Sequence, residues 1–335
     1  MSAVLDPETR STISPDALRS LDEPSVPPSV REMGPSNTNG QGDGEVHPDE
    51  GRHAVAKVEG VDLHWVEYGD ASDRAPVLFL HGLNDSHLTW RRIASALAVD
   101  RRVLALDLPG HGLSGRPDAS YKLDWYAGIV AKWIETMGLE PVDIVGHSLG
   151  GGVAQALLLE KSVTIRRLVL AASGGLGKDI AFVLRLASLP TVVELFGQPF
   201  MSMGTSLALR PWRAVLPLEH IEELSAMNGR EGSARAFSRT VRDVIDWRRG
   251  QKQSFFTRAS EIGELPPITV LWGDNDPIIP VAHGRAFARA VDGVRFEELT
   301  GCGHYLHHDA PDAFLRSVRD ALDAPSWPEM HLRSG

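Results

Sequence analysis

The sequence predicts an α/β protein with a doubly wound, mostly parallel sheet of eight strands and a long inserted helical segment. Two observations lead to this fold class. From about residue 52, short apolar runs rich in β-branched residues alternate with longer stretches of helical periodicity, which is the pattern of repeated strand–helix–strand units. Within residues 173–250 this alternation stops, and only helical periodicity remains.

Eight segments have the character of strands. The first two are separated by Glu59-Gly60, which predicts an antiparallel hairpin. Most of the later ones are continuous apolar runs, as expected for strands that helices cover on both faces. The expected strands are Ala54–Val58, Val61–Glu67, Val77–Leu80, Val103–Leu106, Val142–Val145, Arg167–Ala171, Ile268–Trp272 and Val294–Leu299.

Helical periodicity fills the intervals between these strands. The strands and helices together define a core formed by residues 52–172 and 251–324, followed by a C-terminal tail at 325–335. The expected helices are Leu88–Ala98, Leu123–Met137, Ser148–Lys161, Val281–Val291 and Pro311–Leu322.

The strand-free interval 173–250 is expected to be an all-helical cap over the carboxyl ends of the strands. It is rich in large apolar side chains and interrupted by prolines. One part of it, residues 181–196, is largely apolar but interrupted by Arg185, Pro190 and Glu194, a composition compatible with transient contact with a lipid surface.

The first 51 residues are expected to form a disordered acidic tail. Residues 1–50 contain seven of the 22 prolines, none of the 22 aromatic residues, and ten acidic residues against three arginines. Such a stretch cannot bury enough apolar surface to offset the entropy of ordering it.

Charge and cysteine content exclude several classes of protein. The tail carries −7 of the net charge of −10, so the remainder is near neutral and has no basic stripe for nucleic acid. Cys302 is the only cysteine, which suits a reducing compartment. No apolar run reaches the roughly 18 residues of a membrane span, and no signal-peptide pattern opens the chain. We expect a cytoplasmic protein without stable membrane insertion, whose oligomeric state the sequence leaves open.

The strongest chemical motif is the pentapeptide Gly146-His147-Ser148-Leu149-Gly150. An apolar run precedes it and a helical pattern follows it, which is the strand–turn–helix setting that a G-x-S-x-G motif requires. A serine at such a corner has a strained backbone, and glycines two residues before and after it relieve the crowding. Its hydroxyl then lies at a helix N-terminus, where unpaired N–H groups, first that of Leu149, can bind an oxyanion.

A serine hydroxyl needs a base to take its proton and a carboxylate to orient that base. Two downstream loops fit the chain order of such sites. One leaves an expected strand at Gly273 and contains Asp274 and Asp276, and the other leaves the next strand and contains His304. Both should open at the edge of the sheet that carries Ser148. From the residues alone, either aspartate can face the imidazole.

Together these residues resemble the α/β-hydrolase family, with a likeness that covers residues 53–323 and is only general in the cap. The family's acid stands three residues after the glycine of a W-G-x-x-D pattern, which implies Asp276. The segment His81-Gly82-Leu83 is similar to the family's H-G-x segment, which implies the Leu83 N–H as a second oxyanion donor. Residues 107–114 resemble the family's D-x-P-G-x-G-x-S loop, and we interpret Asp107 in it as structural.

The resemblance implies a serine hydrolase of carboxylic esters that needs no cofactor and binds no metal. Ser148 would attack the ester carbonyl, His304 would accept its proton, and Asp276 would orient the imidazole. The apolar cap predicts a small-molecule substrate with a hydrophobic acyl or alcohol group. The expected substrate contacts are His147, Met201 and Trp212.

Two other functions stay open. A C–C bond hydrolase of vinylogous diketones would use the same three side chains, although relatives of that kind often carry asparagine where this chain has His147. A non-catalytic ligand receptor on a hydrolase fold can also keep these residues. The natural substrate and its chain length cannot be inferred from the sequence.

Overall fold

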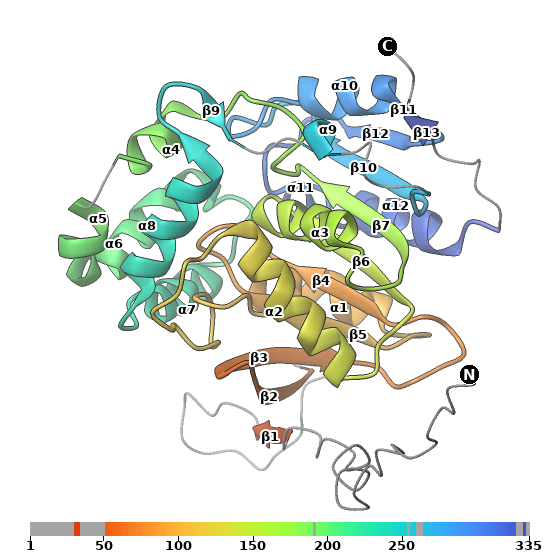
Figure 1. Ribbon diagram of the computed structural model, residues 1–335, viewed down its shortest axis with the longest axis horizontal. Helices are drawn as coiled ribbons and strands as arrows, with labels where there is room; N and C mark the ends of the chain where they lie inside the picture. The colour runs from red at the N-terminus through yellow and green to blue at the C-terminus, as the bar shows by residue number, and fades with distance from the viewer. Residues whose placement is uncertain are drawn as a thin grey trace, which may run out of the picture.

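A nine-stranded sheet forms the centre of the computed structural model, which describes residues 30–33, 51–189, 192–252, 255–258, 264–325 and 331–332 (Figure 1). The strands of this sheet are β1 (Arg31–Met33), β2 (Arg52–Val58), β3 (Val61–Tyr68), β4 (Val77–Leu80), β5 (Val103–Leu106), β6 (Val142–His147), β7 (Ile165–Ala171), β10 (Ile268–Gly273) and β12 (Arg295–Leu299).

The sheet is mostly parallel, as predicted. Its strand order is β1-β2-β3-β5-β4-β6-β7-β10-β12, in which β3 is antiparallel to both of its neighbours and every pair from β5 to β12 is parallel. The eight predicted strands are present, and β1 adds a ninth by pairing antiparallel with β2. The predicted fold class is therefore confirmed.

Helices cover both faces of the sheet. In Figure 1, α2 and α3 lie together in front of the sheet, whereas α1 and α12 pack against each other behind it. Every residue of β4, β5 and β6 is buried, which explains why β4 and β5 are continuous apolar runs and why β6 is apolar apart from Asp143 and the terminal His147. The helices of the core are α1 (Arg91–Leu97), α2 (Leu123–Thr136), α3 (Leu149–Glu160), α10 (Ala282–Ala290), α11 (Leu306–Asp309) and α12 (Pro311–Asp323), with a short helical turn η1 (His87–Trp90) before α1.

An insertion between β7 and β10 forms one end of the long axis of the molecule, on the left in Figure 1. The prediction that it is all-helical was wrong, because two short strands pair as an antiparallel hairpin that ends the helical part. Two-residue strands carry too little periodicity to be recognised in a sequence. The elements of the insertion are α4 (Phe182–Ala187), α5 (Val192–Phe196), η2 (Gln198–Phe200), α6 (Met201–Ala208), η3 (Arg210–Trp212), α7 (Leu218–Asn228), α8 (Ser233–Val244), β8 (Ile245–Asp246) and β9 (Gly250–Gln251). The short helix α9 (Phe255–Arg258) follows them and packs on the main core through Phe255.

Most of the two expected tails lies outside the described residues. Two short segments within them are described: β1, and β13 (His331–Leu332), which pairs antiparallel with β11 (Val291–Asp292). None of the helices that the structure describes combines the length and apolarity needed to cross a membrane.

Candidate active site

Ser148 occupies the sharp corner between β6 and α3. Its backbone has φ 51° and ψ −113°, a conformation that is rare for a residue with a side chain and is typical of strained functional corners. Both flanking glycines are needed. A Cβ at Gly146 would lie 2.7 Å from the Gly150 carbonyl oxygen, and one at Gly150 would lie 2.2 Å from the Leu80 carbonyl oxygen. The G-x-S-x-G spacing thus reflects backbone contacts on each side of the serine.

The imidazole of His304 is held by Asp276. Nδ1 of His304 lies 2.8 Å from Oδ2 of Asp276, whose other carboxylate oxygen accepts hydrogen bonds from the N–H groups of Ile278 and Ile279. The Asp276 side chain is completely buried. Because an ionised carboxylate only accepts hydrogen bonds, Nδ1 carries the proton and Nε2 of His304 is left as the basic nitrogen.

Asp274, the other aspartate of this loop, has a different set of partners. Its Oδ1 accepts hydrogen bonds from the Gly301 N–H at 2.8 Å and from the Asn275 amide at 3.0 Å. It therefore ties the loop after β10 to the loop after β12. From the residues alone, the sequence did not decide which of the two aspartates faces the imidazole. In the structure, Asp276 does.

His147 joins the Ser148 corner to the loop that carries His304. Its Nε2 donates a hydrogen bond to the backbone carbonyl of His304 at 2.9 Å, and the two imidazole rings lie 4.8 Å apart between centroids. Burial lowers the pKa of His147 well below its ordinary value, so this ring is neutral at pH 7. Among the described residues, the Ser148 hydroxyl has no hydrogen bond to His304, a contact that often tightens only when substrate binds.

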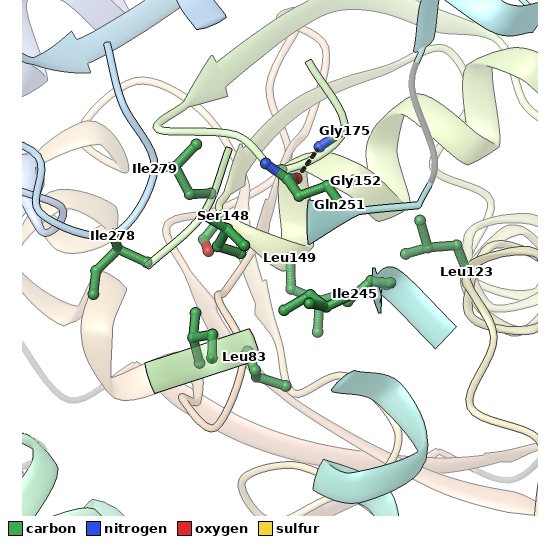
Figure 2. A pocket seen from close by; sticks show the side chains of 14 residues that line it. Leu83, Leu123, Ser148, Leu149, Gly152, Gly175, Ile245, Gln251, Ile278 and Ile279 are labelled. Atoms are coloured by element: carbon green, nitrogen blue, oxygen red, sulfur yellow. Dashed lines mark hydrogen bonds between the residues drawn. The ribbon is translucent and has the colours of Figure 1, made fainter. Parts of the chain in front are cut away.

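A cavity opens around the Ser148 side chain (Figure 2). Nine of its 14 lining residues are leucine, isoleucine or valine, and none of the 14 is charged. Leu83 and Leu149 both line it, and within the described part of the chain neither of their backbone N–H groups has a hydrogen-bond partner. The backbone at Gly82 lies against the corner, since a Cβ there would be 3.3 Å from the Ser148 Cβ. These two N–H groups are thus available beside the serine.

The expected substrate contacts are not part of this cavity. His147 is buried behind the corner, where its ring packs against His304 and Tyr305. Met201 is buried in the insertion, and Trp212 packs on Tyr305 beside a separate apolar cluster of the insertion. The lining instead includes Leu184 from α4 and Ile245 from β8. The general apolar character of the insertion was the only signal for these two residues, and it did not single them out.

Gln251 is the cavity residue with a polar side chain besides Ser148, and sequence reasoning missed it. Its Oε1 accepts a hydrogen bond from the Gly175 N–H at 2.8 Å, shown as a dashed line in Figure 2, and its Nε2 donates to the Asp179 carbonyl. Both ends of the amide are therefore used to fix the hairpin against the loop after β7.

A buried cluster away from the cavity centres on Asp107. Its carboxylate lies 2.8 Å from Nδ1 of His64 and 3.0 Å from Nδ1 of His87, and it also accepts backbone hydrogen bonds from His87 and Leu113. Burial opposes the charge of Asp107, but the adjacent histidines outweigh it and hold its pKa well below the ordinary value. Of the described residues, this is the one set with donor atoms close enough to hold a metal ion. Its direct hydrogen bonds satisfy the carboxylate, in agreement with a structural role for Asp107.

Comparison with known proteins assigns the family. Residues 75–311 match the model of the alpha/beta hydrolase fold. The chain is 34% identical over 261 residues to an uncharacterized protein of Mycobacterium tuberculosis, which covers 74% of this chain and 75% of that protein. The chain therefore belongs to the α/β-hydrolase fold family, as the sequence motifs predicted.

Two further comparisons describe where the chain lies in this family. It is 27% identical to 2-hydroxymuconate semialdehyde hydrolase of a Pseudomonas strain, over 82% of this chain and 94% of that enzyme. The crystal structure of Cfl2 from Burkholderia cenocepacia has the same fold, with a TM-score of 0.69 and 24% identity over 81% of this chain and 96% of Cfl2.

Proposed function

We propose that the protein is a serine hydrolase that cleaves neutral, hydrophobic carboxylic esters. The observation that carries this proposal is the grouping around Ser148. The serine shares one cavity with two unpaired backbone N–H groups, and His147 ties its corner to the loop on which Asp276 orients His304. Acyl transfer requires these parts: a nucleophile, an oriented base and donors for an oxyanion.

In the proposed mechanism, Nε2 of His304 takes the proton of the Ser148 hydroxyl as its oxygen attacks the ester carbonyl. As the new O–C bond forms, the π electron pair of the carbonyl moves onto the carbonyl oxygen. This oxygen becomes an oxyanion, which the N–H groups of Leu83 and Leu149 bind. One such donor typically lowers the barrier by about 3–4 kcal/mol. His304 then gives its proton to the departing alcohol and leaves an acyl-enzyme. Water repeats the sequence, releases the acid and restores Ser148.

The cavity lining supports the substrate class. A carboxylate or phosphate would lose its hydration in this cavity without a cationic partner among the described lining residues, which is unfavourable. An alkyl or aryl group would instead replace water against leucine and isoleucine side chains, at about 25 cal/mol for each Å² buried. A neutral ester is therefore preferred over an acidic substrate.

A C–C bond hydrolase is the second candidate. The identity to 2-hydroxymuconate semialdehyde hydrolase, which extends over nearly the whole of that enzyme, favours it. The uncharged cavity argues against it, because a hydroxymuconate semialdehyde carries a carboxylate. His147 in place of the asparagine that often precedes the serine in such relatives also favours ester cleavage.

The deciding experiment compares p-nitrophenyl esters of increasing acyl length with a dienone acid substrate. We expect hydrolysis of the esters, loss of at least about a thousandfold in kcat for Ser148→Ala, and little cleavage of the dienone. Preferred cleavage of the dienone would select the C–C hydrolase. A wild-type chain that a fluorophosphonate probe fails to label, and that hydrolyses none of the substrates, would favour a non-catalytic receptor.

We also propose that this hydrolase works in the cytoplasm. Cys302 is the one cysteine of the chain, so no disulfide can form within it and the fold has no need of an oxidising compartment. Fractionation of the native host cell tests this placement, and recovery of the protein outside the cytoplasmic compartment would contradict it.

A further inference from the structure

The helix α4 is apolar but has no buried residue. Its sequence, Phe-Val-Leu-Arg-Leu-Ala, would normally be covered by other parts of a protein, because a helix that is apolar on all sides is usually an interior one. Instead, Phe182 and Val183 are 69% and 64% exposed, and Leu186 and Leu189 are also exposed. These side chains form an apolar surface with no cover among the described residues.

The hairpin β8–β9 lies next to this helix and extends the surface. Helix α4 contacts β8, and the N–H of Gln251 in β9 donates to the carbonyl of Lys178, just before α4. The tip of the hairpin carries Trp247, which is 46% exposed, followed by the exposed Arg248 and Arg249. We call Phe182, Val183, Leu186, Leu189 and Trp247, with the two arginines, the α4–hairpin surface.

The α4–hairpin surface adjoins the cavity of Ser148. Leu184, which lies between exposed residues of α4, lines that cavity, and so does Ile245 of β8. One helix therefore presents Phe182 and Val183 to solvent and Leu184 to the site. A hydrophobic molecule held at the outer side would be within one helix diameter, about 10 Å, of the cavity.

The charges of this region point to an anionic occupant. Residues 178–252 contain eleven lysines and arginines and eight acidic residues, a net charge of +3 in a chain of −10. Arg248 stacks on Trp247, with its guanidinium carbon 4.9 Å from the ring centroid. The Asp246 carboxylate accepts hydrogen bonds from the backbone N–H groups of Arg248 and Arg249, and among the described residues neither guanidinium forms a direct ion pair. Exposed aliphatic and aromatic side chains edged by arginine are typical of segments that lie in the interface of an anionic membrane.

A second copy of the chain is the other occupant to consider. In a twofold dimer, the same patch faces itself, so the apolar side chains would be covered but the arginines would meet no acidic residue of the α4–hairpin surface. Anionic headgroups, in contrast, would neutralise the arginines while the acyl region accepts the apolar side chains.

We propose that the α4–hairpin surface docks on anionic lipid and that the cavity takes its ester substrates from that lipid surface. The second half of this statement rests on the proposed ester hydrolase function, whereas the docking itself does not. The cytoplasmic leaflet of cell membranes is anionic, which fits the proposed compartment.

Flotation of the chain with vesicles tests the docking. The Ser148→Ala variant is used so that no lipid is consumed. We expect it to float with vesicles of phosphatidylcholine and phosphatidylglycerol, and roughly fivefold or more weaker with phosphatidylcholine alone, since each arginine contributes that factor near an anionic surface. Adding Phe182→Ser and Val183→Ser should lower partitioning about tenfold or more, because two large apolar side chains are lost. Arg248→Glu with Arg249→Glu should abolish the preference for phosphatidylglycerol.

The matched control is the pair Phe196→Ser and Phe200→Ser. These side chains are 69% and 59% exposed on α5 and η2 of the same insertion but lie outside the α4–hairpin surface. Partitioning of this variant should stay within about twofold, as for other exposed substitutions. Failure of the Ser148→Ala chain to float, or a loss confined to the control pair, would overturn the proposal. A dimer in light scattering that the α4 variant dissociates would assign the surface to a second copy instead.

Activity on a soluble p-nitrophenyl ester separates this proposal from the proposed function. The α4 and hairpin variants should retain the wild-type kcat on that ester, because their exposed side chains do not line the cavity. Docking without any ester hydrolysis would reject the proposed ester hydrolase function and leave the lipid surface. Ester hydrolysis without docking would do the reverse.

Discussion

Replacing Asp276 by asparagine tests the proposed roles of this loop most directly. The two carboxylate oxygens of Asp276 face three donors: Nδ1–H of His304 on one side, and the N–H groups of Ile278 and Ile279 on the other. An asparagine amide has one oxygen for these two sides. If the oxygen keeps the two backbone hydrogen bonds, the amide NH₂ faces Nδ1 of His304. The imidazole must then place its proton on Nε2, and that tautomer cannot accept the serine proton.

The expected loss follows from this change of tautomer. We expect kcat on a p-nitrophenyl ester to fall about ten-thousandfold in Asp276→Asn, which corresponds to about 5.5 kcal/mol of barrier. KM should change much less, because Asp276 does not line the cavity. The variant should fold, since the larger number of hydrogen bonds at the buried carboxylate is retained.

Asp274→Asn is the matched control, two residues earlier in the same loop. Its Oδ1 binds Gly301 and Asn275, and an asparagine oxygen can accept both hydrogen bonds. We expect less than about a threefold change in kcat, as for most exposed substitutions. An Asp276→Asn enzyme within about tenfold of the wild type, or an Asp274→Asn enzyme that loses more, would refute the proposed role of Asp276.

Three further predictions concern stability and positioning. Gly150→Ala places a Cβ 2.2 Å from the carbonyl oxygen of a strand residue and should lower the free energy of unfolding by about 3 kcal/mol or more. Gly128→Ala in α2 has open space around the new Cβ and should raise the free energy of unfolding by up to about 1 kcal/mol. Urea unfolding measures both changes. Burial raises the pKa of Asp85 to about 7, so between about pH 4 and 7 the folded chain holds a proton that the unfolded chain releases, and the stability of the wild type falls as the pH rises. Asp85→Asn should remove up to about 4 kcal/mol of this loss of stability, measured by unfolding across that pH range. His147→Phe keeps a ring but removes the donor to the His304 carbonyl, and it should cost about 1–3 kcal/mol of stability and lower kcat more than it raises KM in steady-state kinetics.

The parts of the fold that could be predicted are those set by local constraints. The strands β4 and β5 are buried along their whole length, so their sequences are unbroken apolar runs that are easily recognised. The motif around Ser148 is equally local, because close backbone contacts at Gly146 and Gly150 exclude any side chain. Strand β1 has neither property: it is three residues long and lies at the edge of the sheet.

The choice between Asp274 and Asp276 shows where local reasoning ends. Both follow the same glycine in one short loop, and both are hydrogen-bonded to backbone N–H groups. Only Asp276 contacts the imidazole, because the loop that carries His304, 28 residues later in the chain, places the ring beside that carboxylate. His147 is a similar case, because its position beside the serine suggests a substrate contact, but burial against His304 turns its ring away from the cavity.

The insertion shows the same limit at the level of a helix face. Phe182 and Leu184 are two residues apart on α4 and equally apolar, so the sequence treats them alike. Residues two apart on a helix point in nearly opposite directions, which sends one side chain into solvent and the other into the cavity of Ser148. Periodicity shows which face of a helix is buried only when the opposite face is polar. Because α4 lacks a polar face, its sequence does not indicate which residues line the cavity and which are exposed. The same lack of a polar face is the reason why we propose that α4 docks on lipid.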